Sequence, residues 1–145
     1  LLSKENGYML TLFVGQNHPA IKKLENLLVH LPSADLHVQT NDMAQLMLHA
    51  DLAITAGGSI TWEKCTLGIP SLVVITGYNQ YSIATRLHDL GVQRTLGLIS
   101  DLTPADYSQH LDTIQPSDMT LMTNSAQLIC DGMGTNYVLN TIRSF

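Results

Sequence analysis

The sequence predicts an α/β fold, in which a parallel sheet is flanked by helices and a helical C-terminal segment follows. Short runs rich in Val, Ile and Leu alternate with helix-length segments up to residue 98, and only helix-length segments follow residue 103. The short runs are apolar at successive positions, which is typical of parallel strands buried on both faces. Repeated strand–helix units require parallel strands, because each crossover returns the chain to the same end of the sheet.

The first part of the chain predicts two strand–helix units. A strand over residues 8–14 is followed by a turn at 15–19 and by a helix that ends at Pro32. A second strand covers residues 36–39, and Asn41 is a suitable N-cap for the next helix. The apolar residues at helical spacing are Ile21, Leu24, Leu28 and Leu31 in the first helix and Met43, Leu46, Met47 and Ala50 in the second.

The middle of the chain predicts three more strands. Residues 52–55 form a short strand, and the helix after it ends where Gly68 and Pro70 stop helical structure. Residues 71–75 are the fourth strand, and residues 94–98 form a weaker fifth strand. The helix between these two carries Ile83, Leu87 and Leu90 and ends at Gly91, and the C-terminal segment predicts helices over 103–114, 117–129 and 134–142.

The turn between the third strand and its helix has a specific chemical use. Two adjacent glycines leave the backbone uncovered and free to adopt positive φ. The first N–H groups of a helix lack intrahelical partners, and the helix dipole adds partial positive charge there. Phosphate oxygens meet that need, so Gly57, Gly58, Ser59, Ile60 and Thr61 form a candidate anion cradle. The structural alternative is a tight turn with Ser59 as the N-cap of the helix.

Glu63 follows this turn within the first part of the helix. With Ser59 as N-cap, the third helical position is Trp62, so Glu63 is not the partner of a capping box. Glu63 either places an acid near the positive end of the helix or accepts hydrogen bonds from a hydroxyl pair such as a ribose diol. We expect Trp62 to pack in the core behind the turn.

The topology predicts where a ligand would bind. In parallel α/β sheets ligands bind beyond the carboxyl ends of the strands. In a single sheet the turns at 15–18, 57–61 and 76–80 share that edge, and Gln39 and Thr40 end the second strand there. The fold is therefore Rossmann-like, although neither the GxGxxG dinucleotide motif nor a P-loop is present in the sequence.

Composition bounds the classes of function. The 145 residues carry a net charge of −5, with 45% hydrophobic and 13% charged residues, as in compact folded domains. The sequence contains no cluster of Lys or Arg that would indicate a nucleic-acid partner. No apolar run reaches the ~20 residues of a membrane-spanning helix, and no signal-peptide pattern is visible, so we expect a cytoplasmic protein. Cys65, Cys130 and the His residues lack metal-ligand spacing, so we expect no metal site and no cofactor.

One part of the sequence carries a family resemblance. It comprises residues 51–63 (DLAITAGGSITWE), residues 67–74 and the pair Asn79-Gln80. These residues resemble the C-terminal domain of GT-B-fold nucleotide-sugar enzymes. The greatest similarity is to the UDP-sugar hydrolase of pseudaminic acid biosynthesis and to its relatives among spore coat polysaccharide biosynthesis proteins. A more distant similarity is to the lipid-linked N-acetylglucosaminyltransferase of peptidoglycan synthesis.

The resemblance implies a reaction and a role for each matched residue. The family hydrolyses the linkage between sugar and nucleotide with an activated water, which releases UDP and a free deoxyamino sugar. The cradle would stabilise the charge that develops on the departing diphosphate. The implied UDP-binding residues are Gly57, Gly58, Ser59, Ile60 and Thr61 for the diphosphate, Glu63 for the ribose, and Gln39 and Thr40 for the uracil; Asn79 and Gln80 would face the sugar.

The chain opens on Leu1-Leu2, which looks like the end of a helix rather than a natural start. We therefore expect residues 1–145 to be a single nucleotide-sugar-binding domain, a C-terminal fragment that lacks the N-terminal domain and its catalytic base. The expected partners are a UDP-sugar and that missing domain, and the fragment alone is expected to be inactive. Two alternatives stay open: the donor-nucleotide domain of a GT-B glycosyltransferase, and a non-catalytic nucleotide-binding α/β domain.

Overall fold

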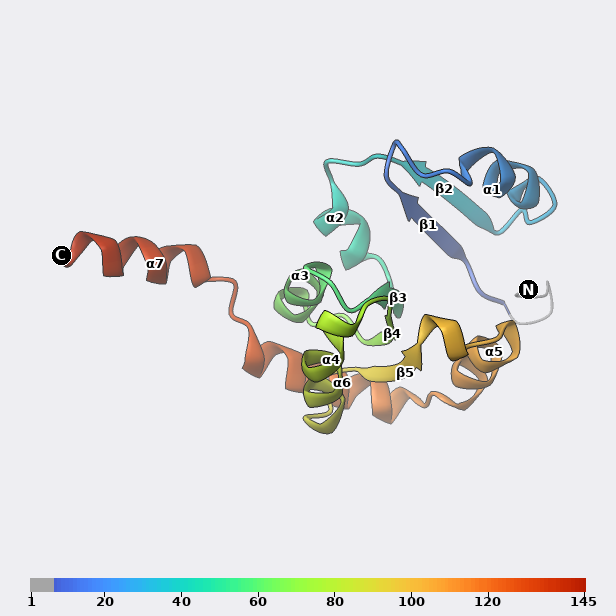
Figure 1. Cartoon of the computed structure of the whole chain (residues 1–145). Helices are drawn as coiled ribbons and strands as arrows, with labels where there is room; N and C mark the ends of the chain where they lie inside the picture. Colours follow the sequence, from blue (N-terminus) through green and yellow to red (C-terminus); the bar gives the residue numbers. More distant parts are fainter. Residues whose placement is uncertain (1–6) are drawn as a thin grey trace. The chain divides into compact units, whose positions relative to one another are not determined.

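The computed structural model describes residues 7–145 of the chain. These residues fall into two compact units, unit 1 up to Met43 and unit 2 from Ala44 to Phe145 (Figure 1). Each unit has its own parallel sheet.

Unit 1 contains one strand–helix–strand motif. Strand β1 (Leu10–Val14) leads to helix α1 (Ile21–Leu28) and then to strand β2 (Ala34–Val38), and the two strands pair in parallel. The rings of Phe13 and His37, which are opposite each other in this pairing, stack with centroids 5.3 Å apart. Every described residue of unit 1 remains at least partly exposed, because a two-stranded sheet with one helix encloses little volume.

Unit 2 contains a three-stranded parallel sheet. Strand β4 lies in the middle of the order β3-β4-β5, and all five of its residues are buried. The strands of this sheet and the helices before and between them are, in chain order, α2 (Met43–Leu48), β3 (Ala53–Ala56), α3 (Ile60–Leu67), β4 (Ser71–Ile75), the short helix η1 (Tyr78–Gln80), α4 (Tyr81–Asp89) and β5 (Arg94–Leu98). Burial of both faces of β4 explains why its sequence reads as a continuous apolar run.

The C-terminal segment is helical, as predicted. A short helix η2 (Ile99–Asp101) precedes α5 (Pro104–Thr113), α6 (Pro116–Ile129) and α7 (Gly134–Arg143). Proline is the first residue of both α5 and α6, where its missing N–H costs nothing. Asp118 accepts a hydrogen bond from the Gln115 backbone N–H at 3.0 Å and one from Arg94 at 2.8 Å, which ties the start of α6 to β5. All residues of α7 are exposed.

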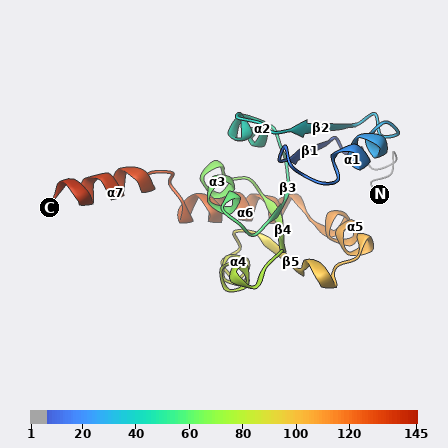
Figure 2. The ribbon, with the colours of Figure 1, turned by 45° about the horizontal axis from the view of Figure 1, so that its top comes forward.

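The core of unit 2 lies between its sheet and helices. Helix α3 packs against α6, and the two lie side by side in Figure 2. One apolar cluster brings α3, α4 and α6 together through Cys65, Leu87, Val92 and Ala126. Within residues 7–145, no helix has the length and hydropathy needed to cross a bilayer.

The fold class is as predicted, but the strands form two sheets and not one. Strand β1 pairs with β2, and β3 and β5 pair with β4. A local apolar pattern identifies a strand but carries no information on which strand lies beside it. The expectation of one shared ligand edge is corrected accordingly: the edge that carries residues 57–61 and 76–80 belongs to unit 2, whereas residues 15–18 with Gln39 and Thr40 belong to unit 1.

Candidate functional site

The turn between β3 and α3 is built by a short series of backbone hydrogen bonds. The Gly57 N–H donates to the Val74 carbonyl at 3.1 Å and extends the pairing of β3 with β4 by one residue. The chain then turns, and Thr61 N–H donates to the Gly58 carbonyl at 3.0 Å. Trp62 N–H donates to the Ser59 carbonyl at 3.1 Å. These bonds close a tight first turn of α3.

Three consecutive N–H groups in this turn have no partner among residues 7–145. In the described part of the chain, the N–H groups of Gly58, Ser59 and Ile60 donate to no protein acceptor. Ser59 is the N-cap of α3, as the structural alternative required, but its side chain makes no capping hydrogen bond. Unpaired N–H groups at the positive end of a helix dipole bind anions. Of the five N–H groups in the candidate cradle, those of Gly57 and Thr61 already donate hydrogen bonds within the protein. The N–H groups available to an anion are therefore those of Gly58, Ser59 and Ile60.

The two glycines of the turn are not required by backbone conformation. Neither Gly57 nor Gly58 has a positive φ. A Cβ atom on Gly58 would meet nothing within 4 Å, so the space beside its Cα is open. A Cβ atom on Gly57 would instead lie 3.4 Å from Oε1 of Gln80. Gly58 therefore leaves an uncovered approach to the unpaired N–H groups.

Thr61 adds a buried hydroxyl to the same helical turn. The residue is only 3% exposed, and its Oγ1 has no hydrogen-bond partner among residues 7–145. A buried hydroxyl without a partner is unusual in folded proteins and calls for an explanation such as a bound water or ligand.

Glu63 and Trp62 are both exposed on α3. Glu63 forms no ion pair or side-chain hydrogen bond with the residues that the structure describes. Its carboxylate is therefore available to a ligand. Trp62 is 44% exposed, so the expectation that it packs in the core is wrong. The buried face of α3 is formed instead by Thr61, Lys64 and Cys65.

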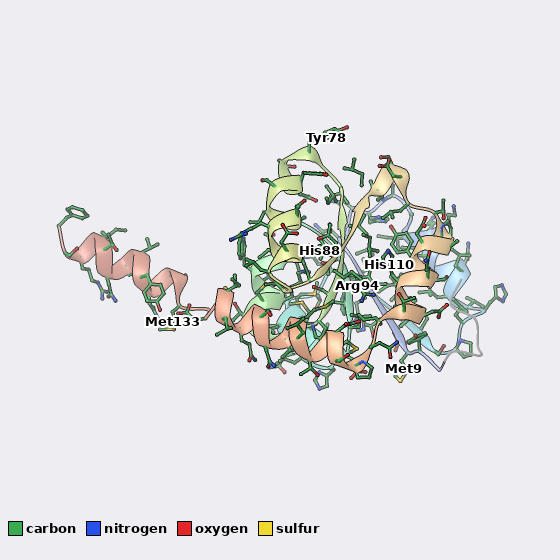
Figure 3. The ribbon with its side chains drawn as sticks, turned by 90° about the horizontal axis from the view of Figure 1, so that it is seen from below. Met9, Tyr78, His88, Arg94, His110 and Met133 are labelled. Carbon is green, nitrogen blue, oxygen red and sulfur yellow. The ribbon has the colours of Figure 1, made fainter. Side chains whose placement is uncertain are left out.

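The turn after β4 lies beside the cradle in the same unit. Oε1 of Gln80 accepts hydrogen bonds from the Thr76 N–H at 3.0 Å and from the Thr76 hydroxyl at 3.2 Å. A Cβ atom on Gly77 would lie 2.8 Å from Oδ1 of Asn79, so the Asn79 side chain folds back over Gly77. Tyr78 projects outward from this turn and is 85% exposed (Figure 3).

Gln39 and Thr40 follow β2 in unit 1. Gln39 has a φ of 56°, and it is the one non-glycine residue with positive φ in the described chain. Its N–H donates to the Val14 carbonyl at 2.9 Å, and Thr40 Oγ1 accepts a hydrogen bond from the Asp42 N–H at 3.0 Å. Non-glycine residues in this conformation cluster at functional sites. Their contact with a nucleobase stays a prediction.

Lys64 is a buried cation that the sequence reading missed. It is 1% exposed, and its Nζ donates to Ser71 Oγ at 2.8 Å and to Gln93 Oε1 at 2.9 Å. Burial lowers the Lys64 pKa from 10.5 to about 8, because desolvation disfavours the charged amine. Ser71 begins β4 and Gln93 precedes β5, so Lys64 lies at the opposite end of the sheet from the cradle. Its helical spacing from Thr61 is the signal that places it on the buried face.

Cys65 is buried, and Cys130 is partly buried. Burial raises the pKa of the Cys65 thiol. Among residues 7–145 no group of His, Cys, Asp or Glu side chains has the arrangement of a metal site.

The sequence model of the glycosyltransferase family 28 C-terminal domain matches residues 4–134. The chain belongs to this family. The match includes the cradle turn, Glu63 and the turn after β4.

Two similar proteins place this family 28 domain in context. The spore coat polysaccharide biosynthesis protein SpsG of Bacillus subtilis (strain 168) is 35% identical over 91 residues, which are 63% of this chain and 26% of that protein. The crystal structure of Acinetobacter baumannii MurG has 18% identity and a TM-score of 0.73, and the alignment covers 99% of this chain and 54% of that one. The family 28 domain thus has the fold seen in MurG and spans part of the length of both proteins.

Proposed function

We propose that the chain binds the nucleoside diphosphate of a UDP-sugar. The observation that carries this proposal is the row of three unpaired N–H groups at Gly58, Ser59 and Ile60, with an open approach beside Gly58. A diphosphate supplies charged oxygens to these donors. Glu63 has no competing protein partner among the described residues, and a free carboxylate can accept hydrogen bonds from the two ribose hydroxyls.

The remaining assignments follow the family resemblance. We propose that Gln39 and Thr40 contact the uracil through main-chain groups and that Asn79 and Gln80 lie toward the sugar. A second domain of the same protein is proposed to supply the catalytic base. The relative SpsG is named for spore coat polysaccharide biosynthesis, which supports a role for this chain in the synthesis of a surface polysaccharide.

Two reactions use such a donor site. In a glycosyltransferase the sugar moves to an acceptor hydroxyl, and membership of family 28 favours this reaction. In a hydrolase the sugar moves to water, and the resemblance of residues 51–63 to the UDP-sugar hydrolase of pseudaminic acid biosynthesis favours that reaction. In both, the N–H groups of the cradle stabilise negative charge on the departing UDP.

The binding proposal is tested by titrating the 145-residue chain with UDP and following backbone amide signals by NMR. Gly58→Ala places a methyl group in the open approach, where it meets no protein atom within 4 Å, so the variant should fold normally and bind UDP about tenfold more weakly. Glu63→Ala should weaken UDP binding by a similar factor, about tenfold, because it removes charge-assisted hydrogen bonds to the ribose.

Matched control variants separate a specific loss of UDP binding from a general loss of folded structure. Gly134→Ala changes another glycine with open space around it, and Glu25→Ala removes an exposed carboxylate on α1; both should bind UDP like the unmodified chain. If UDP at millimolar concentration leaves the amide signals of Gly58, Ser59 and Ile60 unchanged, the binding proposal is wrong.

The two reactions differ in what releases UDP. With the proposed second domain present, a hydrolase releases UDP from a UDP-sugar in buffer alone. A transferase releases UDP at a significant rate only after an acceptor is added. Measurement of UDP release with and without acceptor assigns the reaction.

A further inference from the structure

The carboxamide of Gln80 has an orientation that its partners determine. Its Oε1 accepts hydrogen bonds from both the N–H and the hydroxyl of Thr76, at 3.0 Å and 3.2 Å. A backbone N–H can only donate, so the carboxamide atom that faces it is the oxygen. The Nε2 group is then the free end of the carboxamide, and it donates to no acceptor among the described residues.

Gln80 also lies directly against the cradle turn. Its Oε1 is 3.4 Å, and its Cβ is 3.5 Å, from the position that a Cβ atom on Gly57 would occupy. Gly57 immediately precedes Gly58, which is the first of the three residues with unpaired N–H groups. The Gly57 N–H is bonded to the Val74 carbonyl at 3.1 Å, so the backbone beneath Gln80 is held in place by the sheet.

We propose that Thr76 is a positioning residue that fixes the Gln80 carboxamide so that Gln80 offers only N–H donors to the bound ligand. This proposal rests on the proposed function and deepens it, because it names the atom that Gln80 recognises at the sugar end of the ligand: an oxygen of the β-phosphate, the group to which the sugar is bonded. A charged phosphate oxygen accepts hydrogen bonds and donates none. A carboxamide that was free to rotate would present its own oxygen in part of the molecules and repel the phosphate there.

The test compares UDP with UMP, which lacks the β-phosphate, in NMR titrations of the 145-residue chain. The Nε2 proton signals of Gln80 should shift on addition of UDP and not on addition of UMP. Gln80→Glu keeps an oxygen for Thr76 and puts a second oxygen in place of the N–H donors. This variant should bind UDP about tenfold more weakly and should bind UMP within about twofold of the unmodified chain.

Thr76→Val removes the hydroxyl donor and keeps the backbone N–H. It should weaken UDP binding by a smaller factor of about threefold. In the ligand-free protein it should also broaden or shift the Gln80 side-chain signals, a readout that does not depend on nucleotide binding. Thr85→Val, an exposed threonine on α4, is the matched control and should change neither property.

The outcomes distinguish this inference from the proposed function. If the unmodified chain binds UDP and Gln80→Glu binds it equally well, the positioning role is wrong and the binding function stands. The same conclusion follows if Gln80→Glu weakens UDP and UMP by equal factors, since that result reports only local damage. If the unmodified chain binds neither nucleotide, both the function and the inference are wrong.

Discussion

Gln39 is held in the left-handed backbone conformation at the end of β2, with a φ of 56°. An L-residue with a Cβ atom is strained there, because its side chain crowds the carbonyl oxygen. The strained residue, Gln39, precedes Thr40 at the strand end that is proposed to contact the uracil. Proteins retain such strain where the backbone has to present particular groups.

The strain predicts that Gln39→Gly stabilises the end of β2. Glycine adopts this φ without the Cβ penalty, and the net gain should be about 0.5–1 kcal/mol after the extra flexibility of the unfolded chain is counted. Hydrogen exchange of the β2 amides should slow in the variant. The control Gln39→Ala keeps a Cβ atom and should leave exchange almost unchanged, whereas faster exchange in Gln39→Gly would show that the Gln39 side chain stabilises the turn.

At the scale of elements, helix α3 serves the site at one end and the core at the other. Its N-terminal turn carries the unpaired N–H groups, and its C-terminal end is closed by Gly68 in the left-handed conformation. The Gly68 N–H donates to the Cys65 carbonyl at 3.1 Å, and the Ile69 N–H donates to the Lys64 carbonyl at 2.9 Å. This cap satisfies the last carbonyl groups of the helix.

The cap predicts the effect of Gly68→Ala. Alanine is strained at a φ of 69°, and its Cβ atom would lie 2.9 Å from Nε2 of Gln127 and 3.2 Å from Cγ2 of Thr123 on α6. The free energy of unfolding should fall by about 1–2 kcal/mol. Urea denaturation measures this change. Gly134→Ala, at the first position of α7, should leave stability unchanged or slightly higher, so equal effects of the two substitutions would contradict the argument.

The elements show which features local sequence signals can predict. β4 and β5 have the predicted bounds, and α3 starts after Ser59 as predicted, because apolar runs, glycines and N-cap residues are local signals. The open Gly58 turn of the candidate site was also identified from these signals. Two features depend on distant partners and were not predicted. They are the pairing of β1 with β2 in a separate sheet and the burial of Lys64 against Ser71 and Gln93.

At the scale of the whole molecule, Lys64 makes the stability of the fold depend on pH. Its pKa is lowered to about 8 in the folded chain from 10.5 in the unfolded chain. Between these two values the unfolded chain binds more protons, so stability rises as pH increases through this window. From pH 8 to pH 9 the rise should be roughly 1 kcal/mol.

Urea denaturation at pH 8 and pH 9 checks this prediction. Cys65 acts in the opposite direction, because its thiol pKa is raised above 9.0 in the fold and its contribution to stability is lost as pH increases beyond that value. Cys65→Ala is therefore the background for the comparison. In this background, Lys64→Met should abolish the rise in the free energy of unfolding between pH 8 and pH 9. If the rise persists, another group causes it.

The burial of Lys64 has a practical consequence for work on this family 28 domain. Acylating reagents need an accessible, unprotonated amine, and Lys64 is 1% exposed whereas Lys22 and Lys23 lie exposed on α1. Such reagents will label the α1 lysines at once and Lys64 only in molecules whose interior has opened. The rate of acylation at Lys64 thus reports the fraction of molecules that are open. A tightly bound nucleotide will lower this rate, because it stabilises the folded state and reduces that fraction.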